Sequence, residues 1–188
     1  MTETPGSYFE DLWETSTDPW EHATRWYEER KYDLTVAALP RRRYRYAVEP
    51  ACGVGLLTAR LARRAERVSA SDRFARAVHE TATRCAGDGH VVVECRDVRE
   101  GPAEDQFDLA VLAEVLYYFD ASTVVEILDT WRVAAAADAQ LVLVHYRPSV
   151  SDHVLNGDDV HEIAHRQLGQ PTITIDDPEF RLDLFDAR

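Results

Sequence analysis

From residue 46 onward, short apolar runs alternate with segments of helical periodicity, and this alternation constrains the fold more than any other feature. The expected strands are 46–49, 67–71, 90–95, 107–114 and 140–146. The expected helices between them are 56–64, 74–85 and 122–136. A nearly continuous apolar run such as 107–114 is typical of a strand covered on both faces. Strands that alternate with helices predict a parallel sheet with helices on both faces.

The two ends of the chain depart from this alternation. Between Tyr8 and Leu39, the apolar spacing suits two amphipathic helices broken at Asp18-Pro19, with Asp18 able to cap the second and Pro40 ending it. Near the C-terminus, 172–175 and 180–185 read as strands whose short link allows an antiparallel hairpin but no crossover helix. We therefore expect an α/β fold: a Rossmann-like, seven-stranded, mostly parallel sheet with a C-terminal antiparallel hairpin and an N-terminal helical cap.

The length of the chain and its apolar segments bound the organisation. A chain of 188 residues fits one ordinary domain, here 1–188, with 1–40 as a helical cap or lid and 44–188 as the Rossmann-like core. No apolar run approaches the roughly 20 residues needed to span a bilayer. The acidic, aromatic start of the chain resembles neither a signal peptide nor an Arg-rich transit peptide. We expect a cytoplasmic protein without a membrane partner.

Charge and cysteine content exclude several other classes. The formal net charge of −13 disfavours a nucleic-acid binder, because neutralising phosphates requires clustered Lys and Arg. Cys52, Cys85 and Cys95 are odd in number and form no CxxC pair, which argues against a disulfide framework and a zinc site. Acidic residues and histidines show no metal-ligand spacing either, so no catalytic metal is expected.

Acidic residues and glycines recur where the expected strands end. Ligands of open parallel sheets bind outside the carboxyl ends of the strands, and those ends hold the loop Glu49–Gly55, then Asp72, Asp97 and Glu114. Gly53 and Gly55 allow a sharp turn and a close approach of backbone to ligand. Asp72 lies about 20 residues beyond the loop in the sequence, where a carboxylate can accept hydrogen bonds from both hydroxyls of a ribose. Asp97 is placed to accept a hydrogen bond from an exocyclic amine such as that of adenine.

The loop sequence also resembles a known motif. Glu49-Pro-Ala-Cys-Gly-Val-Gly55 looks like the first motif of class I S-adenosylmethionine methyltransferases, an acidic residue followed by spaced glycines. Over almost the whole chain, the resemblance sharpens to the nodulation N-methyltransferase (NodS-like) family. It rests on Tyr8-Phe9, Asp18-Pro-Trp20, Trp26-Tyr27-Glu28, Leu112-Ala-Glu-Val-Leu-Tyr-Tyr118, Leu143-Val-His145 and Gly157-Asp-Asp-Val-His161. One departure is Ala51, where the general class has its first glycine; the turn tolerates alanine if its φ stays below zero.

The resemblance implies S-adenosylmethionine as cofactor and a role for each strand-end residue. Glu49 would organise the ammonium group of the cofactor, Asp72 would hold its ribose, and Asp97 with Val98 would hold its adenine. The loop would contact the methionine part, mainly through Gly53. The implied cofactor-binding set is completed by Ala51, Gly55, Arg73, Glu114 and three lid residues, Trp20, Trp26 and Arg30. Core packing of the cap helix is the alternative for the tryptophans.

The chemistry of methyl transfer suggests further candidates. The protein must align the nucleophile with the methyl group, exclude water and, for an amine, accept a proton. Candidate catalytic residues are Glu114 and Tyr117 after the fourth strand, His145 at the end of the fifth and His161 farther on. Each has a structural alternative: Glu114 capping a turn, Tyr117 packing as an aromatic, His145 as a satisfied core histidine, and His161 beginning a helix.

These observations favour a methyltransferase that acts on a small molecule, with an amine of a sugar or another small metabolite as the preferred acceptor. The alternatives are a small-molecule O-methyltransferase and a catalytically silent nucleotide-binding or scaffold protein. A dehydrogenase shares the first half of the fold. However, it usually has a tighter G-x-G-x-x-G than 53–58 provides, and it gives no role to Asp97 or the hairpin. The expected assembly is a monomer or a homodimer.

Overall fold

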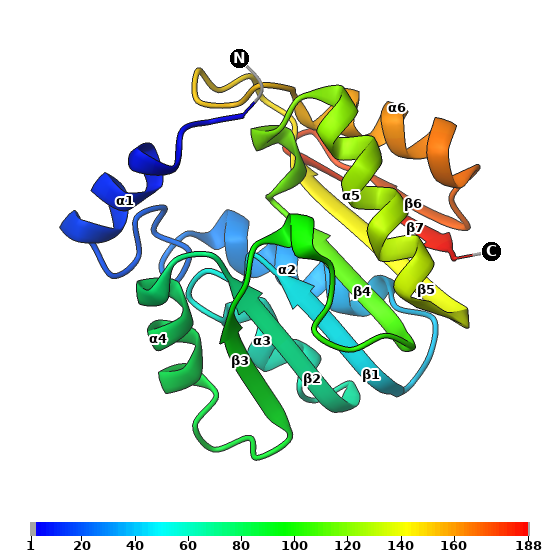
Figure 1. Cartoon of the computed structure of the whole chain (residues 1–188), viewed down its shortest axis with the longest axis horizontal. Coiled ribbons are helices and arrows are strands. Elements are labelled where there is room, and N and C mark those ends of the chain that lie inside the picture. Colours follow the sequence, from blue (N-terminus) through cyan, green and yellow to red (C-terminus); the bar gives the residue numbers. More distant parts are fainter. Residues whose placement is uncertain (1–2, 188) are drawn as a thin grey trace. The chain divides into compact units, whose positions relative to one another are not determined.

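A computed structural model describes residues 3–187, which divide into two compact units. The N-terminal unit is Pro5–Val98, and the C-terminal unit runs from Arg99 onward and includes Glu3 and Thr4. Figure 1 labels the helices α1–α6 and the strands β1–β7. A single domain over the whole chain stays a prediction.

The N-terminal unit contains three parallel strands in the order β3-β2-β1. The register of these strands pairs Glu49 with Ala70 and Asp72 with Cys95. The acidic residues at the strand ends therefore lie together at the carboxyl ends of the three strands. Its elements are α1 (Gly6–Thr15), α2 (Trp26–Ala38), β1 (Tyr44–Pro50), α3 (Leu56–Leu61), β2 (Ala65–Asp72), α4 (Ala75–Arg84), β3 (Val91–Cys95) and the start of η1 (Val98–Glu100).

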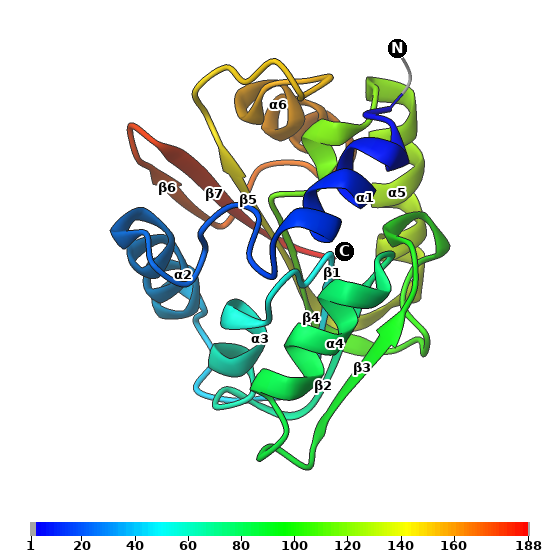
Figure 2. The ribbon, with the colours of Figure 1, turned by 90° about the vertical axis from the view of Figure 1, so that its left-hand side faces the viewer.

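The C-terminal unit contains four strands in the order β4-β5-β7-β6. Strands β4 and β5 are parallel, whereas β7 lies between β5 and β6 and pairs antiparallel with both of them (Figure 2). Its elements are β4 (Phe107–Ala113), η2 (Leu116–Tyr118), α5 (Ala121–Ala134), β5 (Ala135–Tyr146), α6 (Gly157–Leu168), β6 (Ile173–Asp176) and β7 (Phe180–Asp186).

Apolar burial organises the C-terminal unit around β4. Six residues of this strand are buried, and α5 lays Ile127, Leu128 and Trp131 into the core. The rings of Phe107 and Trp131 lie 6.0 Å apart between centroids. Complete burial of each such side chain contributes about 1.5–3 kcal/mol. The spacing of these side chains on one face of α5 explains why the sequence predicted this helix, and the continuous apolar run of β4 explains why it predicted the strand.

The predicted fold class is confirmed: the sheet has seven strands, mostly parallel, with a C-terminal antiparallel pair. The N-terminal helices also form, but the role expected for Asp18 is wrong. Its carboxylate accepts hydrogen bonds from the amides of His22 and Ala23, and so it closes the turn before α2, whose N-cap is Arg25. The predicted helix 56–64 ends three residues early, at Leu61, and the predicted strand 140–146 begins five residues early, at Ala135.

Helix α6 begins in a capping box that sets its direction. The side chain of Asn156 accepts from the Asp159 amide, and the Asp159 carboxylate accepts from the Asn156 amide. Immediately after the cap, Gly157 lies against the end of β5. A Cβ atom at Gly157 would stand 2.4 Å from the carbonyl oxygen of Tyr146, a backbone atom that has little room to move.

We expect Gly157→Ala to destabilise the chain by roughly 1–3 kcal/mol, because the new methyl group must displace the backbone of β5 or of α6. Urea unfolding followed by circular dichroism measures this loss. Gly87→Ala is the matched control, since a Cβ atom there meets nothing within 4 Å. Equal unfolding midpoints for the Gly157 variant and the parent chain would show that α6 does not need this close approach.

Candidate functional site

The loop after β1 turns through three residues in the left-handed region. The φ angles are 54° at Ala51, 56° at Gly53 and 77° at Gly55. The expectation that Ala51 keeps a negative φ is therefore wrong. The amide of Cys52 donates to the carbonyl oxygen of Ser71 at 3.0 Å, and this contact draws the loop back over β2. A left-handed alanine costs about 1–3 kcal/mol, which the surrounding contacts must offset.

Helix α4 holds the same loop from its other side. The hydroxyl of Thr81 donates to the Gly53 carbonyl at 2.9 Å, and the Arg84 guanidinium donates to the Val54 carbonyl at 2.6 Å. Gly55 is needed here, because a Cβ atom would lie 2.9 Å from the Cα of Thr81. The loop is thus fixed between β2 and α4, and its backbone is closely covered at Gly55.

Asp72, the last residue of β2, closes the loop with its carboxylate. One oxygen accepts from the amide of Gly53 at 3.1 Å, and the other accepts from the amide of Phe74 at 3.0 Å. Burial raises the pKa of Asp72 to about 6, although these backbone hydrogen bonds lower it in part. The carboxylate predicted to hold a ribose therefore also determines the shape of the glycine loop.

Glu49 lies beneath the loop as a second buried carboxyl group. It is 3% exposed, and the hydroxyl of Thr58 donates to its Oε2 at 2.6 Å. Burial raises its pKa to about 8; the hydrogen bond from Thr58 lowers the pKa, and the charge of Asp72 raises it. Two desolvated carboxyl groups next to an open glycine backbone are an environment that a bound cation would stabilise.

The residues after β3 lie where the sequence placed them. Asp97 is half-buried, and its carboxylate forms an ion pair with Arg73 at 3.7 Å between Oδ2 and Nη1. Val98 is buried at the start of η1. Arg73 follows Asp72 directly, so one arginine links the ends of β2 and β3. Binding of adenine by Asp97 and Val98 stays a prediction.

The aromatic residues of the predicted lid differ in their surroundings. The ring of Trp20 stacks on His22 at 5.6 Å between centroids and meets Trp13 edge-on at 5.6 Å. Trp26 is 71% exposed at the start of α2, so core packing is wrong for this residue. Arg30, farther along α2, is half-buried. Closure of these residues over a cofactor stays a prediction.

His22 is a residue that no sequence signal identified. A Cβ atom at Gly53 would meet only the His22 ring, at 3.8 Å, so the imidazole is the neighbour of the exposed face of the loop. His22 follows no motif, and its position depends on the turn that Asp18 closes. The structure therefore adds His22 to the side chains that surround the glycine loop.

In the C-terminal unit, Glu114 and Tyr117, the two candidates after β4, are in direct contact, and a catalytic role for either stays a prediction. The phenol of Tyr117 donates to Oε2 of Glu114 at 2.6 Å, and the amide of Tyr146 donates to the same oxygen at 2.9 Å. Glu114 has a φ of 54°, a strained backbone for a residue with a side chain. The turn therefore holds a carboxylate in a fixed orientation at the carboxyl ends of β4 and β5.

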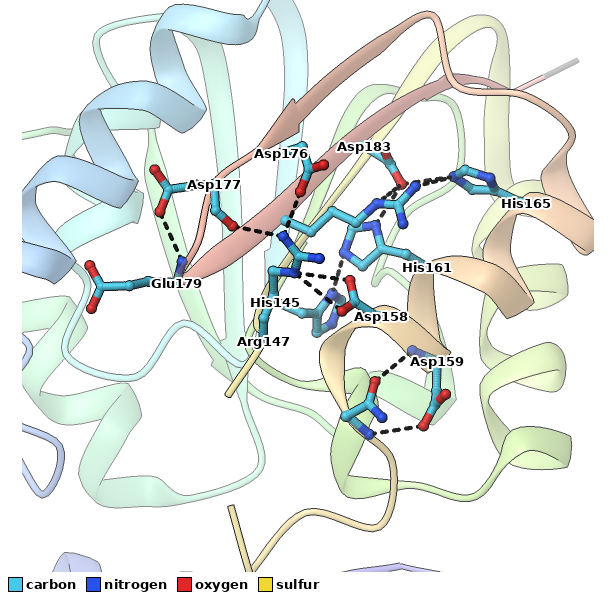
Figure 3. A network of polar contacts seen from close by, with 12 residues as sticks. His145, Arg147, Asp158, Asp159, His161, His165, Asp176, Asp177, Glu179 and Asp183 are labelled. Atoms are coloured by element: carbon cyan, nitrogen blue, oxygen red, sulfur yellow. Dashed lines mark hydrogen bonds and ion pairs between the residues drawn. The ribbon is translucent and has the colours of Figure 1, made fainter. Parts of the chain in front are cut away.

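His145 and His161 are both fully buried in a polar network, drawn in Figure 3. Nε2 of His145 accepts from the amide of Leu116 at 3.3 Å, and its Nδ1 lies 3.2 Å from Nε2 of His161. Nδ1 of His161 is 2.7 Å from the carboxylate of Asp183. Because every ring nitrogen has a partner, the geometry favours the alternative of satisfied core histidines, and a catalytic role for either stays a prediction.

The charge in this network resides on Asp183. Burial lowers the pKa of His161 more than the hydrogen bond to Asp183 raises it, so the ring is neutral. Burial raises the pKa of Asp183, but hydrogen bonds from His161 and Thr174 outweigh this effect and keep that pKa below its ordinary value. The carboxylate also accepts from Arg181 and lies 2.8 Å from His165. At the centre of this network, the buried carboxylate of Asp183 is therefore stabilised by several hydrogen-bond donors.

Several general expectations can be compared with the described residues 3–187. Among them, no group of three or more His, Cys, Asp or Glu side chains is arranged to hold a metal ion. Cys52 and Cys85 are buried free thiols, and Cys95 is an exposed one. Within the same part of the chain, no helix has the length and apolar character needed to cross a membrane.

Sequence comparison identifies one family. The model of the nodulation protein S (NodS) family matches residues 10–169. Nodulation protein S of Sinorhizobium fredii (strain NBRC 101917 / NGR234) is 33% identical over 104 residues, which cover 55% of this chain and 48% of the relative. The Rhizobium tropici protein is 30% identical over 102 residues, or 54% and 43% of the two chains. The matched part thus spans about half the length of these curated relatives.

Solved structures extend the similarity over the rest of the chain. A Pseudomonas syringae protein, provisionally named a methyltransferase, is 38% identical with a TM-score of 0.75, covering 86% of this chain and 99% of that one. The N-methyltransferase NodS from Bradyrhizobium japonicum WM9, solved with S-adenosyl-l-homocysteine, has a TM-score of 0.82. It is 22% identical, and the match covers 96% of both chains. At this identity, the second match demonstrates a shared fold.

The raised pKa of Glu49 predicts a measurable pH dependence of stability. The folded chain keeps this group protonated up to a pKa of about 8, whereas the unfolded chain ionises it near its ordinary pKa of 4.5. The folded state therefore binds more protons between these values, and the free energy of unfolding falls as the pH rises across that window. We expect Glu49→Gln to make this fall shallower in urea unfolding of the ligand-free chain.

Glu66→Gln provides the matched control, because Glu66 is exposed on the neighbouring strand β2. Its stability should follow the parent chain at every pH. If Glu49→Gln and Glu66→Gln show the same dependence on pH, Glu49 does not hold its proton in the folded chain.

Proposed function

Because the chain belongs to the nodulation protein S (NodS) family, we propose that it is a methyltransferase that uses S-adenosylmethionine to methylate an amine of a small molecule. The observation that carries this proposal is the glycine loop 50–55 fixed by Asp72 above the buried Glu49. The Bradyrhizobium japonicum protein with this fold is an N-methyltransferase solved with S-adenosyl-l-homocysteine, which supports the same cofactor here.

The residues of the N-terminal unit fit such a cofactor. Glu49 would take up the ammonium group of its methionine part, because a cation removes the cost of ionising this buried carboxyl group. Asp72 would accept from the ribose hydroxyls, and Asp97 with Val98 would contact the adenine. Gly53 leaves the backbone open toward the methionine part. The cofactor supplies a methyl group on a positively charged sulfur atom, ready for transfer to a nucleophile.

The remaining site residues would shape the same binding region. Ala51 and Gly55 hold the left-handed turns of the loop, and Arg73 pairs with Asp97. Trp20, Trp26 and Arg30 would form the lid. The exposed ring of Trp26 offers an apolar surface that a bound cofactor could cover.

Glu114 supports an amine as the acceptor. Its carboxylate is oriented by Tyr117 and by the backbone of Tyr146, and a fixed carboxylate attracts an ammonium group. An amine must then lose a proton before it can attack the methyl group. The formal net charge of −13 likewise favours a neutral or cationic small molecule over an anionic one. Amino sugars have this chemistry.

Asp72→Asn should weaken binding of S-adenosylhomocysteine at least about tenfold in titration calorimetry, because charged hydrogen bonds to the ribose contribute about 1.5–3 kcal/mol each. The variant keeps the size of the side chain while removing its charge. Asp138→Asn changes an exposed aspartate in β5 and should bind like the parent chain. Unchanged affinity in a folded Asp72 variant would remove this residue from the cofactor site.

Transfer itself can be followed with S-adenosylmethionine that carries an isotope-labelled methyl group. We expect mass spectrometry to find the label on glucosamine, and not on phenol or benzoate presented at equal concentration. Labelled phenol with inert glucosamine would favour an O-methyltransferase. Absence of label on every acceptor, together with normal binding of S-adenosylhomocysteine, would favour a catalytically silent nucleotide-binding protein.

A further inference from the structure

His153 lies in the segment between β5 and α6, and it packs face to face on Tyr117. The two rings are 3.7 Å apart between centroids at an interplanar angle of 14°. Tyr118 meets the same imidazole edge-on, with centroids 5.1 Å apart. The imidazole is therefore part of an aromatic cluster on the turn that carries Glu114 and Tyr117.

Backbone hydrogen bonds hold His153 in this place. The amides of Val154 and Leu155 both donate to the carbonyl oxygen of Tyr117, at 2.9 and 3.1 Å. The amide of His153 donates to Val150, and the hydroxyl of Thr4 donates to the carbonyl oxygen of Asp152. The segment is thus fixed to the end of β4 and positions the imidazole with little freedom.

The ring nitrogens of His153 are unused by the protein. Nδ1 is buried without a hydrogen-bond partner, and neither nitrogen bonds to any of the described residues 3–187. In His145 and His161, by contrast, every ring nitrogen has a partner. Buried polar groups are normally hydrogen-bonded, so a rigidly held imidazole without a partner indicates a ligand or a proton-transfer role.

The charges around His153 suit proton transfer. Burial lowers the pKa of the imidazole, while the carboxylates of Glu114 and Asp152 raise it in part. The ring is consequently neutral at neutral pH and keeps a lone pair. The same carboxylates would stabilise the imidazolium once it formed.

We propose that His153 takes the proton from the ammonium group of the acceptor while Glu114 binds that group. This inference rests on the proposed function, since it concerns the acceptor of the same reaction. In the step, an N–H bond of the ammonium group breaks and its electron pair stays on the amine nitrogen. The proton forms a bond to the lone pair of the imidazole, and the imidazolium later releases it to water. The neutral amine is then the nucleophile.

Nuclear magnetic resonance of the full chain, labelled with ¹⁵N-histidine and saturated with S-adenosylhomocysteine, tests the contact directly. We expect glucosamine to move the ring signals of His153 and to leave those of the buried His145 and His161 in place. If saturating glucosamine leaves the His153 signals unchanged, the proposal is overturned. This measurement needs no variant, so it does not depend on whether a substitution folds.

His153→Gln tests the proton transfer. With glucosamine at pH 7, kcat should fall at least about 100-fold, and the acid limb of the rate profile should lose the step due to this histidine. Affinity for S-adenosylhomocysteine should stay within about twofold of the parent chain. His79→Gln, on the exposed face of α4, is the matched control and should change neither quantity. A His153 variant with the parent kcat and acid limb contradicts the proposal.

The two proposals fail in different ways. If the parent chain methylates no amine, the proposed function fails, and the histidine signals alone then decide the role of His153. Movement of those signals with glucosamine supports an amine site at this residue, and their absence of movement overturns it. If the parent chain methylates glucosamine while His153→Gln is fully active, only the inference about His153 fails.

Discussion

The hydrogen bond from the Gly53 amide to the Asp72 carboxylate is the interaction on which the candidate cofactor site depends. It joins the end of β2 to a loop whose backbone is left-handed at Ala51, Gly53 and Gly55. An alanine in that region is strained, and hydrogen bonds from Thr81 and Arg84 of α4 help to retain the loop. The same carboxylate therefore fixes the loop and is also the group that we propose accepts hydrogen bonds from the ribose. A ligand that bonds to Asp72 would necessarily act on the shape of the loop.

The C-terminal unit uses a similar principle at the end of β4. Glu114 has a strained backbone, and its carboxylate is fixed by Tyr117 and by the amide of Tyr146. His145 accepts a hydrogen bond from the amide of Leu116 in this turn. Through His161, it is linked to the buried carboxylate of Asp183 (Figure 3). The imidazole of His153 stacks on the Tyr117 ring of the same turn. Of the histidines in this region, the buried pair is suited to support the turn and His153 to receive a proton.

Much of this arrangement is predictable from the sequence, because apolar periodicity is a local property. The strands and the terminal hairpin follow from apolar periodicity and from turn residues, which can be recognised without the rest of the fold. The acidic residues at the strand ends follow once the strands are placed. The capping box of Asn156 and Asp159 is also local, yet the sequence suggests this helix only as an alternative that begins at His161, whereas α6 begins at Gly157. Side-chain roles are less accessible. The φ of Ala51 depends on Ser71 and α4, and the place of His153 depends on Tyr117, all of which are distant in sequence.

The buried histidines illustrate the same limit in physical terms. An apolar strand end around His145 indicates burial, but it does not reveal that His161 and Asp183 satisfy the ring from another helix and another strand. Conversely, nothing near His153 in sequence marks it as a ring without a partner. Polar satisfaction is a property of the folded chain, and it separates these residues more sharply than their sequence context does.

The measurement that tests the central claim most directly is a crystal structure of the chain with S-adenosylhomocysteine bound. The predicted result has Asp72 accepting hydrogen bonds from the ribose hydroxyls and Glu49 next to the ammonium group, with the backbone at Gly53 against the methionine part. A ligand that binds elsewhere on the chain and contacts neither Asp72 nor the glycine loop would contradict the assignment of this loop as the cofactor site.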